Sequence, residues 1–143
     1  MNTDKTDDLM NILNSVEDNA ELNEYVNDID DRYPAGFADY MKQILEQKGM
    51  SVADLQKKSR IDRTYIYQIM DGSKNPGRDK IIAMALGAQL TLEECQRALK
   101  TASEGILYAK NRRDSILIYA VNNRLSIMET NALLEEYQTL PLQ

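Results

Sequence analysis

The chain has 143 residues, of which 43% are apolar and 28% are charged, and its net charge is −6. That apolar share is enough for a packed core and excludes a disordered chain, while the few Gly and Pro and the many helix-forming residues predict an all-α protein. There is no His, and the only Cys is Cys95, so an internal disulfide is excluded and the commonest general base and metal ligand are missing. We therefore expect a protein that is not an enzyme and that uses no metal or cofactor.

Nothing in the sequence indicates a membrane segment. No apolar run is longer than residues 81–86, whereas roughly 20 residues are needed to cross a bilayer. The first eight residues are acidic and polar, unlike a signal peptide. We expect a cytoplasmic protein with no membrane partner. The apolar neighbours of Cys95 favour a buried thiol over a redox or catalytic one.

Residues 1–32 are predicted to form an acidic N-terminal helical arm. They hold ten acids against Lys5 and Arg32, a net charge of 2 − 10 = −8, so the remaining 111 residues carry +2. Apolar residues recur at helical spacing on both sides of Asp18 and Asn19, which predicts two short amphipathic helices. The two stripes are Leu9, Ile12, Leu13 and Val16, and then Leu22, Tyr25, Val26 and Ile29.

Three interpretations of this arm remain open. Its stripes could pack on the rest of the chain and leave the acids in solvent. The acids could instead cover a basic DNA-binding face as a lid, which would oppose DNA binding because charges act over roughly 8–10 Å in physiological salt. Finally, the arm could bind a partner or a second copy.

After a predicted linker at residues 33–36, the spacing of apolar residues predicts a helix over 37–48 that ends at Gly49. Its inner face would hold Phe37, Tyr40, Met41, Ile44 and Leu45.

The stretch from residue 50 to residue 79 has the pattern of a helix-turn-helix. Ser51 and Asp62 are good N-caps, and residues 59–61 between the two helices are too few to do more than turn the chain. Gly72 can take the positive φ that follows a helix end, and Pro76 prevents the helix from resuming. The second helix would turn Ile66, Ile69 and Met70 inward.

Two further helix pairs are predicted. A largely buried helix over 78–87, closed by Gly87, leads to a helix capped by Thr91. Shifting residues 78–99 by 35 positions aligns them with 113–134, and Arg, Asp, Ile, Ala, Leu and Glu coincide. This indicates a duplicated helix pair, with chance similarity of two amphipathic pairs as the alternative. Residues 104–143 would then be a C-terminal helical extension.

From residue 37 to residue 99 the chain resembles the lambda-repressor-like (Cro/XRE-type) helix-turn-helix family. The residues that carry the resemblance are Ser51, Leu55, Ile61, Asp62, Ile66, Ile69, Gly72, Asn75, Pro76, Ile81, Ala85, Leu86 and Gly87. The resemblance implies a bundle of about five helices over 37–103. The expected fold is therefore an all-α, lambda-repressor-like five-helix bundle with an acidic N-terminal arm and a C-terminal helical-hairpin extension.

Several positions depart from the family pattern. Val52 stands where a polar Gln usually opens the first motif helix, Gln56 replaces a small Ala, and Arg60 replaces the Gly of the turn. Leu45 and Met70 stand where some members carry a buried ion pair. This last exchange could be neutral or stabilising, because burying two charges is costly.

The resemblance also implies a function: a homodimeric, sequence-specific transcriptional regulator that places the helix over about 62–71 in the major groove of double-stranded DNA. The family's base-reading positions correspond to Arg63, Thr64, Tyr67 and Gln68, whose chemistry suits base edges. Expected contacts to the DNA backbone are Ser51, Lys57, Arg60, Lys74 and Arg78.

A second hypothesis is a protein–protein interaction adaptor that keeps the bundle and does not bind DNA. Residues 50–80 hold seven bases and four acids, a modest local charge of +3 for a DNA-binding surface. Tyr and Arg on the outer helix also suit a protein interface, and the acidic arm or the C-terminal extension could bind a protein partner.

Overall fold

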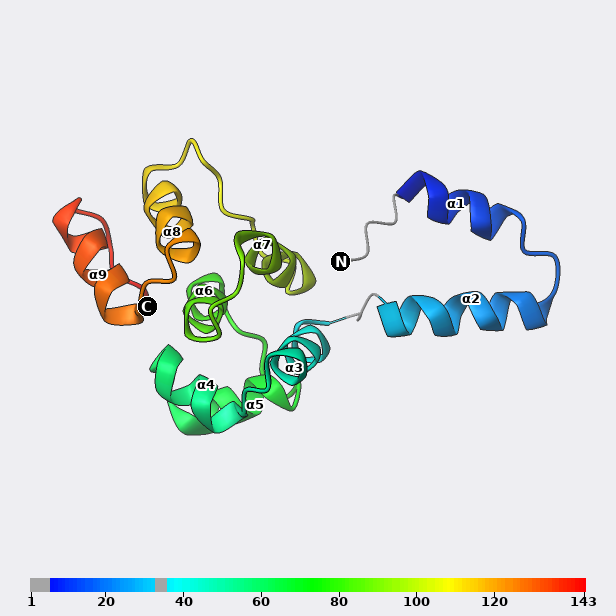
Figure 1. Cartoon of the computed structure of the whole chain (residues 1–143), viewed down its shortest axis with the longest axis horizontal. Coiled ribbons are helices and arrows are strands. Elements are labelled where there is room, and N and C mark those ends of the chain that lie inside the picture. Colours follow the sequence, from blue (N-terminus) through cyan, green and yellow to red (C-terminus); the bar gives the residue numbers. More distant parts are fainter. Residues whose placement is uncertain (1–5, 33–35) are drawn as a thin grey trace. The chain divides into compact units, whose positions relative to one another are not determined.

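The computed structural model describes residues 6–32 and 36–143, and within these ranges every regular element is a helix (Figure 1). The predicted all-α fold class is therefore confirmed. The chain divides into two compact units, Met1–Ala35 and Gly36–Gln143. Among the described helices, none is long and apolar enough to span a bilayer.

The first unit contains the two predicted helices, α1 (Thr6–Asn14) and α2 (Asn19–Arg32). The break between them is fixed by side chains: Asp18 Oδ1 accepts a hydrogen bond from the Glu21 amide at 2.8 Å, and Glu21 Oε2 accepts one from the Glu17 amide at 2.9 Å. The first bond satisfies an amide in the first turn of α2, and the second ties the chain before α2 to that turn. Large apolar side chains on both helices are exposed, namely Met10, Ile12, Leu22 and Val26.

The second unit begins with α3, whose N-cap is Gly36; the other residues of the predicted linker, 33–35, lie outside the described residues. Helices α4 and α5 form the helix-turn-helix, and Ser51 and Asp62 cap them as predicted by accepting bonds from the amides of Asp54 and Tyr65. The first five helices of this unit are α3 (Phe37–Lys48), α4 (Val52–Ser59), α5 (Arg63–Met70), α6 (Arg78–Gly87) and α7 (Leu92–Thr101).

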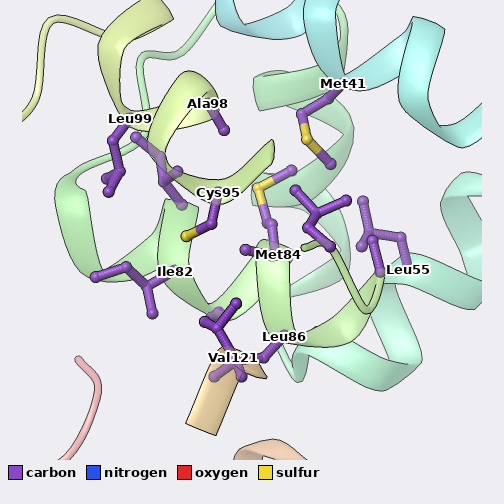
Figure 2. Packing of buried hydrophobic residues seen from close by; sticks show 14 of the residues in the cluster. Met41, Leu55, Ile82, Met84, Leu86, Cys95, Ala98, Leu99 and Val121 are labelled. Atoms are coloured by element: carbon purple, nitrogen blue, oxygen red, sulfur yellow. The ribbon is translucent and has the colours of Figure 1, made fainter. Parts of the chain in front are cut away.

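Helix α6 is the centre of this unit. Residues 81–87 are all buried, and α6 contacts α4, α7, α8 (Arg112–Asn122) and α9 (Ile127–Glu136). Figure 2 shows Met84 of α6 in the same part of the core as Met41 of α3 and Leu55 of α4. A helix that is apolar on every side is typical of a core element, as the sequence predicted for this segment.

Gly87 is the last residue of α6, as predicted, but it does not adopt the positive φ that often follows a helix end. The helix continues through Gly87 to the C-cap Ala88, and the positive φ of 53° falls on Gln89. A Cβ atom at Gly87 would lie 2.9 Å from the amide nitrogen of Ser59 at the end of α4. Glycine is needed here because the backbones of α4 and α6 approach each other closely.

Replacing Gly87 by Ala should therefore lower the free energy of unfolding by about 1–3 kcal/mol, because one of the two helices must shift. Urea unfolding followed by circular dichroism measures the change. Gly105→Ala is the matched control, since its new Cβ would meet its nearest neighbour, Arg78 Nε, at 4.0 Å. Equal stability of the two variants would show that the contact is not tight.

Helices α8 (Arg112–Asn122) and α9 (Ile127–Glu136) form a hairpin that packs on α6 and α7. Structural details recur between the two hairpins at a spacing of 35 residues. The capping box of Thr91 and Glu94 recurs at Ser126 and Glu129. Positive φ angles recur as well, at Gln89 and Arg124 and at Ser103 and Gln138.

Two reciprocal ion pairs join the hairpins, and we call them the Arg–Asp clasp. Arg78 donates to both carboxylate oxygens of Asp114 at 2.9 and 2.8 Å, and Arg113 donates to both oxygens of Asp79 at 3.0 and 2.8 Å. Each arginine also donates to two carbonyls, those of Gly105 and Ile106 for Arg78 and those of Leu140 and Pro141 for Arg113. Because equivalent residues contact each other reciprocally, the hairpins are related by an approximate two-fold axis.

The clasp holds its carboxylates in the charged form. Burial raises the pKa of Asp114, but the hydrogen bonds from Arg78 and from the Tyr108 amide lower it by more than burial raises it. The pKa of Asp114 therefore lies below its ordinary value. The pKa of Asp79 is lowered in the same way by Arg113 and the Gln143 amide. A carboxylate with a lowered pKa stabilises the fold above its unfolded-state pKa of about 4, and this contribution is lost as the pH falls through the folded-state value.

Asp114→Asn should lower the free energy of unfolding at pH 7 by roughly 1–3 kcal/mol, because the partly buried Arg78 loses the charged partner that it binds through two hydrogen bonds. The difference from the unmodified chain should shrink as the pH falls below about 4, where the carboxylate itself becomes protonated. Urea unfolding across this pH range tests both statements. Glu135→Gln, at an exposed position, serves as control; a pH-independent difference for Asp114→Asn would contradict the assigned role of the charge.

Candidate nucleic-acid interface

Helix α5 presents the side chains predicted to read bases. Its inner face is fixed in the core by Ile66, Ile69 and Met70, all buried. The opposite face exposes Arg63, Thr64 and Tyr67, with Gln68 partly exposed beside them. The amphipathic spacing that anchors one side of the helix therefore decides which residues face solvent.

The four predicted base-reading side chains, together with Asp71, line one open hollow of about 480 Å³. The Arg63 guanidinium carbon lies 5.6 Å from the centre of the Tyr67 ring, a cation–π contact that orders both side chains. Chemically, the hollow combines an Arg fork, an amide that both donates and accepts, and aromatic and methyl surface. These groups can bind guanine, adenine and the methyl of thymine.

Asp71 is the member of this hollow that the sequence analysis missed. Its carboxylate accepts hydrogen bonds from the hydroxyl and amide of Ser73, at 2.6 and 2.8 Å, and these bonds lower its pKa. The group is therefore ionised at neutral pH and can accept from a base amino group. The four-residue spacing of positions 63, 67 and 71 would have identified it, because such positions share one helix face.

Most of the predicted backbone-contacting residues are also exposed. Ser51 lies at the N-terminus of α4, and Lys57 and Arg60 lie in its last turn and at its C-cap. Lys74 lies in the loop after α5, where its amide donates to the Gln68 carbonyl at 3.1 Å and orders the loop. The N-terminus of α4 and the cationic side chains are suitable groups for phosphate binding.

Arg78 has a different role in the structure from the predicted one. Its guanidinium makes four hydrogen bonds within the Arg–Asp clasp, to Asp114 and to the carbonyls of Gly105 and Ile106. An arginine has five N–H donors, so little is left for a phosphate. The sequence shows Arg78 as one of the seven bases of residues 50–80, and the partner that it binds in the structure, Asp114, lies 36 residues further along the chain.

The turn of the motif tolerates the departures from the family pattern. Arg60 adopts the left-handed conformation, with φ of 59°, and its amide donates to the Gln56 carbonyl at 3.0 Å. The Gln56 side-chain amide donates across the turn to the Ile61 carbonyl at 2.8 Å. Leu45 and Met70 are both buried, so the positions of the family's occasional ion pair are apolar here.

The substitution Arg60→Gly separates the effect of the positive φ at this residue from the effect of its charge. We expect the free energy of unfolding to rise by about 0.5–1 kcal/mol, because glycine takes a positive φ without steric cost. We expect affinity for duplex DNA to fall at the same time, because a cation near the backbone is lost. Thermal unfolding and DNA titration of one preparation measure both; a rise in affinity would exclude Arg60 from the interface.

Within residues 6–32 and 36–143, no group of three or more His, Cys, Asp or Glu side chains could hold a metal ion. Cys95 is fully buried, and burial raises the pKa of its thiol to about 12. A thiol with that pKa is not a thiolate nucleophile at neutral pH.

A family model described as "Helix-turn-helix" matches residues 41–95, from the middle of α3 to the first turn of α7. This match spans the α4–α5 motif and the hollow on α5. No curated protein and no solved structure matches the chain.

Proposed function

We propose that the chain binds double-stranded DNA at specific sequences, as an XRE-type transcriptional regulator of the lambda-repressor-like kind, through the helix-turn-helix at residues 41–95. The observation that carries this proposal is the hollow on α5, which gathers Arg63, Thr64, Tyr67 and Gln68 on one exposed face. In helix-turn-helix proteins the second motif helix enters the major groove and reads base edges with such side chains.

The proposed contacts divide into two kinds. The side chains of the hollow on α5 would read the bases. The surrounding groups, Ser51, Lys57, Arg60 and Lys74, would bind phosphates and set the orientation of α5. Arg78 would act indirectly, by holding the start of α6 in the Arg–Asp clasp.

We further propose that the regulator is a cytoplasmic homodimer, whose two-fold symmetry would match two half-sites about one helical turn apart. The acidic arm, residues 1–32, and the extension after residue 103 would then serve contacts other than those to DNA.

Selection from random duplex DNA, followed by titration at several salt concentrations, tests the proposal. We expect Arg63→Ala to lose about 1–3 kcal/mol of discrimination at one base position. Lys74→Ala should weaken binding evenly across sequences and reduce the salt slope by about 1. Lys110→Ala removes an exposed cation on a loop away from α5 and should change neither property.

A different result would favour the second hypothesis. If the full chain enriches no sequence, and its affinity for DNA does not fall as salt rises, counterion release does not occur. The bundle would then act as a protein-binding adaptor, with the exposed tyrosine and arginine of α5 at its interface.

A further inference from the structure

The two hairpins differ in how one face of each is covered. On the first hairpin, Met84 and Ala98 are fully buried, because α4 packs on α6 and α3 packs on α7. Their equivalents 35 residues later, Tyr119 and Leu133, are 54% exposed and partly exposed, respectively. The face that is core in the first hairpin is thus open to solvent in the second.

This open face is hollowed between its two helices. It forms a hollow of about 570 Å³ between α8 and α9, which we call the hairpin groove. The residues that line it are Arg112, Ser115, Ile116, Tyr119, Leu133 and Tyr137. Amphipathic helices bind to proteins by laying an apolar stripe into such a groove.

The first hairpin shows what kind of helix fits. Helix α3 packs on α7 of this hairpin, while α4 covers α6. The side of α3 that does so carries the apolar series Phe37, Tyr40, Met41 and Ile44, at spacings i, i+3, i+4 and i+7, all buried. The Tyr40 hydroxyl reaches α7, where it donates to the Glu94 carbonyl at 3.5 Å. A helix with this series therefore suits the equivalent side of α9, which corresponds to α7 in the second hairpin.

The chain contains a second copy of that series in α2. The stretch LNEYVNDI, residues 22–29, aligns with FADYMKQI, residues 37–44, without a gap. Tyr and the final Ile are identical, an acid precedes Tyr in both, and the other stripe positions are apolar in both. Amphipathic spacing alone is common, but the shared aromatic and acid positions make α2 a specific match to α3. The Leu22 and Val26 side chains of this stripe are exposed in the first unit.

We propose that α2 of one copy of the chain docks in the hairpin groove of a second copy, as α3 docks on the first hairpin. Two copies exchanging α2 reciprocally would form a closed, two-fold dimer. Charge favours this pairing, because α2 carries Glu21 and Glu24 while Arg112 lies exposed at the rim of the groove. The proposal does not depend on DNA binding.

The test measures the mass of the full chain in solution by sedimentation velocity over a range of micromolar concentrations. We expect a monomer–dimer equilibrium that Tyr25→Ser on α2 and Tyr119→Ser in the groove each weaken at least tenfold. Tyr108→Ser is the matched control, since Tyr108 is 57% exposed and lies outside the groove. Circular dichroism and thermal unfolding confirm that each variant is folded.

A mixing experiment identifies the two partners. Either variant alone has two defective sites per dimer, whereas an equal mixture forms a heterodimer with one intact site, so the mixture should associate more tightly than either variant. A chain that stays monomeric overturns the proposal. A dimer that Tyr119→Ser weakens and Tyr25→Ser does not would show that another segment fills the groove, and this also overturns it. Failure here leaves DNA selection unchanged, so the two proposals can fail separately.

Discussion

The second unit depends on the close contact between α4 and α6. Gly87 lets the end of α4 approach α6 until a Cβ would be 2.9 Å from the Ser59 amide, and this contact sets where the turn of the motif begins. From that turn the chain enters α5, whose buried face leaves the hollow around Arg63 on the outside. The contact at Gly87 thus positions α4, on which α5 packs, and the buried face of α5 then decides which side chains point outward.

Much of the fold could be predicted from the sequence, because local signals and burial agree. Caps such as Ser51, Asp62 and Thr91 mark helix starts, and apolar spacing marks the inner faces. The role of Gly87 could not be predicted, since a glycine near a helix end has the same local signature whether it adopts a positive φ or permits a close approach. Likewise, the positive φ at Arg60 is stabilised by the Gln56 side chain, a contact that spacing alone does not reveal.

In the candidate site, the sequence is a better guide to residues that lie on one helix face than to residues whose role depends on a partner far away in the chain. Arg63 and Gln68 follow from position on α5, and the structure brings both to one hollow. Asp71 could have been found by the same reasoning. The role of Arg78 could not have been found in this way, because its partner Asp114 lies in another hairpin. Only the three-dimensional arrangement shows that the matched Arg-Asp pairs of the repeat bind each other.

The Arg–Asp clasp also limits how this chain can be divided or recombined. Removing α8 and α9 would leave Arg78 and Asp79 without their partners, and it would uncover part of the apolar surface of α6, on which Val121 packs in Figure 2. The family match ends at residue 95, yet the compact unit that contains it continues to Gln143. A helix-turn-helix is commonly treated as a portable cassette, but moving this motif without the second hairpin would break both ion pairs of the clasp.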